Sequence, residues 1–223
     1  MKILCFGDSL TGCGGVDGRY SDILQDRFPA HLFLNKGVGG DTLASARKRF
    51  KKDVLDEQPD IVLLELGAND WWMNERPVTA WAADLERFIT RIRKTGAQVV
   101  VLGVFGPNRA EDGRLIEVTY GVDDRAWAFH QAEKVIAARH GCPYVANIQE
   151  RLKLQRSQPR CRSWADMNHP NEYGNRYVAD AIEPALEELL GDKALPIRKP
   201  ALTTTRDFWR EAVALAPERL AVV

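Results

Sequence analysis

The sequence has no excess charge of either sign and no hydrophobic run long enough to cross a membrane. Its 31 lysines and arginines balance 31 aspartates and glutamates, so there is no net field to attract nucleic acid phosphates or anionic lipid. The apolar run at the N-terminus ends at Gly7, too early for the core of a signal peptide. We therefore expect a cytoplasmic protein with no nucleic acid partner and no stable membrane insertion.

Cysteine is scarce as well, with four residues in 223: Cys5, Cys13, Cys142 and Cys161. They form no C-x-x-C pair, and a chain of this length needs no disulfide to fold, so we interpret them as reduced thiols. The histidines and cysteines also lack the spacing of zinc ligands. We expect no metal and no cofactor.

Two nucleotide-binding motifs and one hydrolase motif are absent. No G-x-x-x-x-G-K-[ST] segment occurs. The cluster Gly12-Cys13-Gly14-Gly15 fails the dinucleotide fingerprint, because Asp17 occupies the third glycine position. A G-x-S-x-G motif is missing too, which excludes the nucleophile-elbow type of α/β hydrolase.

Strand-like apolar runs alternate with helical patterns along the chain. The predicted strands are 2–6, 32–34, 61–66, 99–105 and 144–145, and the predicted helices are 20–28, 42–57, 78–94, 123–140 and 172–190. Runs such as Ile61-Val62-Leu63-Leu64 are apolar throughout, as a strand buried on both faces requires. The fold class predicted is α/β, a three-layer α/β/α sandwich around a parallel sheet of about five strands.

The only plausible boundary follows the last long helical pattern. We assign residues 1–191 to one domain and 192–223 to a linker with a short amphipathic C-terminal helix. That helix is expected to pack on the body of the protein or on a partner subunit, which would make a homo-oligomer.

Polar segments follow the predicted strands. They are Gly7-Asp8-Ser9-Leu10, Asn35 to Thr42 and Gly67-Ala68-Asn69-Asp70, with Asp166-Met167-Asn168-His169-Pro170-Asn171 before the last long helix. Ligand sites of parallel sheets gather at the carboxyl ends of the strands, so these segments can converge. Together they supply a serine, a histidine with a nearby carboxylate, and amide donors, which are the components that acyl transfer needs.

With these four segments the sequence resembles the SGNH hydrolase superfamily, also called the GDSL esterase/lipase family. The resemblance rests on the order of the blocks across about 170 residues, and on Asp166-x-x-His169-Pro170-Asn171-x-x-Gly174. It departs from the family at Ala68, where many members have a second glycine. The resemblance implies a flavodoxin-like sheet, in agreement with the periodicity.

The resemblance also implies roles for individual residues. Ser9 would be the nucleophile, His169 its general base and Asp166 the carboxylate that orients His169. The oxyanion hole would consist of the Ser9 and Gly40 amides and the Asn69 side chain. The expected activity is hydrolysis of a small-molecule carboxylic ester. The alternatives are an acyltransferase, a lysophospholipase or thioesterase acting on longer acyl chains, and a non-catalytic binding relative.

Residues beside these blocks are candidates for substrate contact, namely Asp8, Trp71, Trp72, Asn108 and Trp164. Flat aromatic walls suit a sugar ring or an aryl group. The segments around the expected site are polar or aromatic, and they offer no aliphatic groove for a long chain. We therefore expect a preference for short acyl groups, including acetylated carbohydrate and aryl esters.

Overall fold

The computed structural model describes residues 1–15, 17–73, 76–103, 123–146, 148 and 169–195. Five parallel strands form one sheet in the order β2-β1-β3-β4-β5. The strands are β1 (Lys2–Gly7), β2 (Leu32–Gly37), β3 (Ile61–Glu65), β4 (Gln98–Leu102) and β5 (Tyr144–Val145). This is the doubly wound order of flavodoxin-like folds, and it confirms the predicted fold class.

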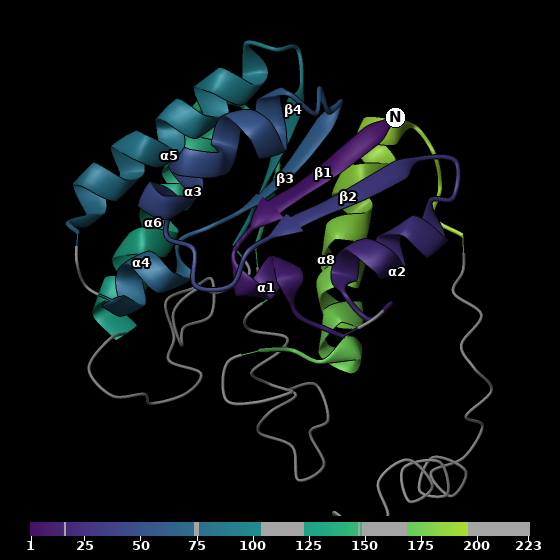
Figure 1. Ribbon diagram of the computed structural model, residues 1–223, viewed down its shortest axis with the longest axis horizontal. Helices are drawn as coiled ribbons and strands as arrows, with labels where there is room; N and C mark the ends of the chain where they lie inside the picture. Colours follow the sequence, from purple (N-terminus) through teal and green to yellow (C-terminus); the bar gives the residue numbers. More distant parts are fainter. Residues whose placement is uncertain (16, 74–75, 104–122, 147, 149–168, 196–223) are drawn as a thin grey trace, which may run out of the picture.

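Helices cover both faces of the sheet (Figure 1). On one face lie α3 (Leu43–Phe50), α5 (Val78–Arg93) and α6 (Asp123–Arg139), and on the other lie α2 (Tyr20–Arg27) and α8 (Glu172–Leu190). Two short helices begin at the carboxyl ends of strands, α1 (Ser9–Gly12) after β1 and α4 (Ala68–Met73) after β3. They occupy segments in which the sequence indicated no element.

The core is divided into two layers by the alternation of side chains along the strands. Leu4 and Phe6 of β1 pack with α3 and α5, while Ile3 and Cys5 face α2 and α8. All four are fully buried, and burial of a large apolar side chain contributes about 1.5–3 kcal/mol. The central strands therefore hold the carboxyl end of the sheet rigidly beneath the loops of the site.

The observed bounds differ from the expected ones mainly at strand and helix ends. Strand β2 continues to Gly37, three residues beyond the expected end, because its amides pair with β1 through Gly7. The predicted helix 42–57 is α3 followed by a π-helical turn, Lys51–Leu55. The last helix matches its predicted bounds and continues through Pro184.

The chain after α8 returns to the body of the protein. The Leu195 amide donates to the carbonyl of Arg27 at 2.8 Å, and Ala194 packs against the layer that contains α2. The expected C-terminal helix and its part in a homo-oligomer lie outside the described residues, so the division at residue 191 stays a prediction. None of the described helices is long and apolar enough to span a bilayer.

Candidate active site

The segments expected to form the site come together at the carboxyl end of the sheet. Ser9 follows β1, Gly40 follows β2, Asn69 lies in α4 just after β3, and His169 lies just before α8. The contacts described below link the segments that carry these four residues. Asp166 lies outside the described residues, so its role stays a prediction.

Ser9 and His169 are in direct contact. The Oγ atom of Ser9 lies 3.0 Å from Nε2 of His169, although the two residues are 160 positions apart. This is hydrogen-bond distance between a hydroxyl and an imidazole nitrogen. A neutral imidazole placed this way can accept the hydroxyl proton as the oxygen attacks an electrophilic carbon.

A close approach of backbone positions the turn that carries Ser9. At Gly7 a Cβ atom would lie 2.6 Å from the carbonyl oxygen of Glu65 and would also collide with the hydroxyl of Thr11. Only glycine fits there. The chain can therefore leave β1 sharply, with Asp8 Oδ1 accepting from the amide of Leu10 at 2.9 Å.

Two asparagines hold His169 beside the serine. Asn171 caps α8, its Oδ1 accepting from the amides of Tyr173 and Gly174 at 2.9 and 3.2 Å. Asn175, fully buried, donates to the carbonyl of Cys13 at 3.1 Å and accepts from the amide of Tyr20 at 3.2 Å. It ties the start of α8 to the loop after α1.

The segment after β2 forms a turn over the serine. The Asp41 amide donates to the carbonyl of Val38 at 3.2 Å, which leaves the Gly40 amide outside the hydrogen bond of the turn. Gly40 has a φ of 77°, as the third position of a type II turn requires. A Cβ atom on Gly39 would lie 3.9 Å from the Cβ of Ser9. The turn therefore lies beside Ser9 at Gly39.

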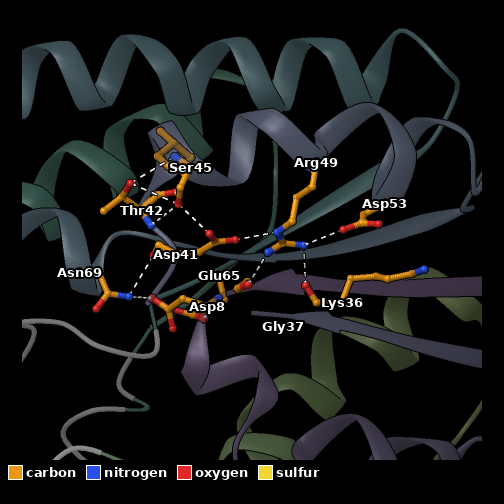
Figure 2. A network of polar contacts seen from close by, with 12 residues as sticks. Asp8, Lys36, Gly37, Asp41, Thr42, Ser45, Arg49, Asp53, Glu65 and Asn69 are labelled. Carbon is orange, nitrogen blue, oxygen red and sulfur yellow. Dashed lines mark hydrogen bonds and ion pairs between the residues drawn. The ribbon is translucent and has the colours of Figure 1, made fainter. Parts of the chain in front are cut away.

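The side chain of Asn69 points toward the same turn (Figure 2). Its Nδ2 donates to the carbonyl of Asp41 at 2.9 Å and to Oδ2 of Asp8 at 3.2 Å. Both protons of the Asn69 side-chain amide are thus used in hydrogen bonds, of which the one to Asp8 is the longer. An oxyanion that binds to Asn69 would therefore replace the hydrogen bond to Asp8.

Arg49 of α3 braces this turn from behind (Figure 2). Its guanidinium donates to Asp41 Oδ2 at 2.6 Å and to the carbonyls of Lys36 and Gly7 at 2.8 Å each. Ser45 donates to the other oxygen of Asp41 at 2.6 Å. One cation thus joins the ends of β1 and β2 to the loop that carries Gly40.

The expectation that Asp8 contacts substrate needs correction. Its side chain is 0% exposed, and both of its oxygens accept hydrogen bonds from the protein. Burial, followed by the charge of Glu65, raises the pKa of Asp8 well above its ordinary value. Asp8 therefore belongs to the support beneath the nucleophile.

Trp71 and Trp72 stand edge to face, with ring centroids 6.0 Å apart and planes at 84°. Trp71 is partly buried against the α3 and α5 layer, whereas Trp72 is 62% exposed. Of the pair, Trp72 has the surface for contact with a ligand. Asn108 and Trp164 lie outside the described residues, and their substrate contacts stay predictions.

A sequence profile of the GDSL-like lipase/acylhydrolase family matches residues 5–177. The chain belongs to this family. The match covers Ser9, Gly40, Asn69 and His169, and in the structure Ser9 contacts His169 while Asn69 contacts Asp41, the residue after Gly40.

Several members of the GDSL-like family with curated names are similar to the chain. An arylesterase of Vibrio mimicus is 30% identical over 112 residues, which are 48% of this chain and 56% of the relative. An acetylxylan esterase of Geobacillus stearothermophilus is 31% identical over 88 residues, 32% of this chain and 40% of the relative. These alignments therefore span about half the length of the curated relatives.

Solved structures of GDSL-like enzymes share the fold. TesA superposes with a TM-score of 0.71 at 23% identity, covering 85% of this chain and 99% of that one. The acetyl xylan esterase AlAXEase superposes with a TM-score of 0.68 at 21% identity, covering 83% and 100%. At these identities the superpositions establish the architecture.

Sequence reasoning missed three residues that shape this site: Arg49, Glu65 and Asn175. Arg49 and Asn175 lie in helical patterns that contain other polar residues, whereas Glu65 interrupts an apolar strand pattern. Glu65 ends the run Ile61-Val62-Leu63-Leu64 and is 2% exposed. A charged residue in a buried run needs partners, and that was the signal available from the sequence.

Proposed function

We propose that this protein is a serine esterase that hydrolyses carboxylic esters with short acyl groups. The observation that carries the proposal is the 3.0 Å contact between Ser9 Oγ and His169 Nε2. A serine hydroxyl is a weak nucleophile until a base accepts its proton. The contact provides that base within reach of the hydroxyl.

The reaction proceeds in two halves. Ser9 Oγ bonds to the ester carbonyl carbon while its proton passes to His169, and the same proton then goes to the departing alcohol oxygen. Water next gives a proton to His169 and its oxygen to the acyl carbon. The Ser9–acyl bond breaks, the acid leaves, and Ser9 recovers the proton from His169. Asp166 would orient His169 and stabilise its cation.

The charge that develops on the carbonyl oxygen needs donors beside the serine. The Ser9 and Gly40 amides and Asn69 Nδ2 are the donors in this proposal. The turn at Gly40 and the hydrogen bond from Asn69 to Asp41, 2.9 Å long, support it. Donors fixed before the reaction stabilise the transition state without reorganisation.

We further propose that the substrate is a small ester, such as an acetylated carbohydrate or an aryl ester. The names of the relatives support this class, since they include an acetylxylan esterase and an arylesterase. The exposed ring of Trp72 offers a flat face for a sugar or aryl ring. The cytoplasmic location stays a prediction, which cell fractionation would test.

The test measures acid released from nitrophenyl acetate and from acetylated xylo-oligosaccharides, with no other acceptor than water. The wild type should release acid, and Ser9→Ala should not. Thr95→Ala, which removes a hydroxyl at the opposite end of the sheet, is the matched control and should keep full activity. Release of nitrophenol only after addition of an acceptor alcohol, with the acetyl group recovered as an ester of that alcohol, would assign a transferase. No turnover at all would contradict the proposal and favour a non-catalytic relative.

A further inference from the structure

A second set of hydrogen bonds connects Ser9 with His169 through the backbone. The amide of Cys13 donates to the carbonyl of Ser9 at 2.7 Å, at the end of α1. The carbonyl of Cys13 accepts from Nδ2 of Asn175 in α8 at 3.1 Å. The same Nδ2 donates at 3.3 Å to the carbonyl of Pro170, the residue after His169. With the contact between Ser9 Oγ and His169 Nε2, these bonds form a closed ring.

The neighbours of Asn175 determine the orientation of its side-chain amide. Oδ1 accepts from the amide of Tyr20, the first residue of α2, at 3.2 Å. Nδ2 lies 3.1, 3.3 and 3.1 Å from the carbonyl oxygens of Cys13, Pro170 and Asn171. An N–H group needs an acceptor and a carbonyl needs a donor, so the flipped amide would not fit. The side chain is fully buried, and its removal would leave the Tyr20 amide and the Cys13 carbonyl without this partner.

A glycine allows the loop after α1 to approach α8 this closely. Gly14 has a φ of 129°, and a Cβ atom there would lie 2.7 Å from Asn175 Nδ2 and 2.4 Å from the carbonyl oxygen of Gly18. Both distances are too short for a carbon atom, so only glycine fits. Gly15 also has a positive φ, 77°, but no atom outside its chain neighbours lies within 4 Å of its Cβ position. The close approach to Asn175 is therefore a property of Gly14 and not of the whole glycine cluster.

Other contacts hold the rest of α8 against the protein. Arg27 of α2 forms ion pairs with Asp180 and Glu183, and the apolar side chains of α8 pack with those of α2 and β1. These contacts lie further along the helix than Asn175. Loss of the Asn175 amide should therefore release the beginning of α8, next to His169, and leave the remainder of the helix in place.

We propose that Asn175 is a positioning residue for Ser9 and His169. It acts through the backbone, by fixing the start of α8 relative to the loop after α1 and so the distance between the hydroxyl and the imidazole. A base must lie within hydrogen-bond reach of the proton that it accepts, and a misplacement of about 1 Å is enough to slow a reaction severely. The inference rests on the proposed esterase function.

The first test is the steady-state kinetics of Asn175→Ala with nitrophenyl acetate. We expect kcat to fall by roughly 10- to 100-fold with little change in KM. Gln25→Ala is the matched control, because the Gln25 amide also accepts from a backbone amide, that of Phe33 at 3.0 Å, and donates to a backbone carbonyl, that of His31 at 2.8 Å. These contacts lie at the amino end of the sheet, so kcat should be unchanged. Equal losses of kcat in the two variants, or a change confined to KM, would overturn the proposal.

The second test opens the same connection from the side of the loop. Gly14→Ala should lower kcat by a similar factor, because its Cβ atom would displace the Asn175 amide. Gly15→Ala introduces a side chain at a positive φ as well, but into open space, and should keep full kcat. This pair leaves Asn175 in place, so it provides the test even if Asn175→Ala does not fold, which circular dichroism would establish. Equal kcat in the two glycine variants would contradict the inference.

The third test asks whether Asn175 acts through His169. Asn175→Ala should slow the labelling of Ser9 by a nitrophenyl phosphonate when His169 is present. It should add no further loss in the His169→Gln background, where no base depends on the position of α8. An equal decrease of the labelling rate in both backgrounds would show a general effect on the fold and would overturn the proposal.

A crystallographic measurement separates this inference from the proposed function, because it needs no catalysis. In crystals of Asn175→Ala, the distance between Ser9 Oγ and His169 Nε2 should exceed about 3.5 Å, beyond hydrogen-bond reach. In Gln25→Ala it should stay at 3.0 Å, as in the wild type. An unchanged distance in Asn175→Ala would overturn the inference even if the protein proves an active esterase. A longer distance in a protein without esterase activity would support the positioning role and contradict only the proposed function.

Discussion

Arg49 Nε donates to Asp41 Oδ2 at 2.6 Å, and through this ion pair α3 holds the loop that carries Gly40 (Figure 2). The carbonyl of the same Asp41 accepts from Asn69. Asp41 therefore links Arg49 to two of the expected oxyanion donors, Gly40 and Asn69. A displacement of Asp41 would therefore be expected to displace both the Gly40 amide and the Asn69 side chain.

Replacement of Arg49 should therefore impair catalysis more than binding. Arg49→Met keeps an apolar stem over the Phe6 ring, on which the guanidinium stacks at 4.2 Å, but it removes every hydrogen bond. We expect kcat to fall by roughly 10- to 100-fold with little change in KM, since small misplacements of catalytic groups have effects of this size. Steady-state kinetics on nitrophenyl acetate measures both constants.

Two controls separate a positioning role from general damage. Arg91→Met removes a guanidinium that lies over Phe50 at 4.8 Å, and it should leave kcat unchanged. Methylguanidinium added to Arg49→Ala should restore part of the lost kcat, because it can fill the vacated position between the carbonyls and Asp41. Equal losses of kcat in Arg49→Met and Arg91→Met, with no recovery of kcat when methylguanidinium is added, would contradict a positioning role for Arg49.

Activity should fall as the pH is lowered, because a protonated His169 cannot accept the proton of Ser9. His169→Gln should lose nearly all turnover at every pH. Asp166→Asn should keep the fold and lose turnover by about 10- to 10⁴-fold, as expected for a carboxylate that orients the base. The measurement is kcat/KM across the acid range. An acid limb that persists in the residual activity of His169→Gln would contradict the assignment.

Asn69→Ala should lower kcat by about 10²- to 10³-fold, the usual cost of one oxyanion donor. KM should change far less, because the donor acts on charge that exists only in the transition state. Asn69→Asp keeps nearly the shape of the asparagine but places a negative charge beside the oxyanion. This variant should be at least as inactive as Asn69→Ala. A change confined to KM would instead assign Asn69 to substrate binding.

The expected preference for short acyl groups can be tested with a series of esters that differ only in acyl length. Each methylene that a pocket buries contributes about 0.8 kcal/mol, so a long-chain pocket would give a kcat/KM that rises steadily from four to ten carbons. We expect kcat/KM to be highest from acetyl to about butyryl esters and to fall beyond. Nitrophenyl esters below their aggregation limits provide the measurement. A steady rise would favour a lysophospholipase or thioesterase.

Much of the fold could be predicted from the sequence because its pattern is strong. The predicted strands 61–66 and 144–145 and the predicted helix 172–190 agree with the observed bounds to within one residue. The site residues Ser9 and His169 could be paired because each lies in a recognisable block, and the fold brings them to 3.0 Å.

The support around the site could not be predicted in the same way. Arg49 looks like one more cation in a basic helix, and only the tertiary structure brings its guanidinium to the carbonyls of Gly7 and Lys36. The partners of Glu65 lie 54 and 57 positions away. Hydrogen bonds between groups so distant in sequence depend on strand order, which local patterns do not encode.

The central claim is that Ser9 is the nucleophile, and covalent labelling tests it most directly. A nitrophenyl phosphonate should inactivate the wild type with release of one nitrophenol per chain, and peptide mass spectrometry should find the phosphonyl group on Ser9. Ser9→Ala should fold normally and take up no label. His169→Gln should be labelled far more slowly, since its serine has no base. A label on any other residue, or equal labelling of Ser9→Ala, would contradict the account.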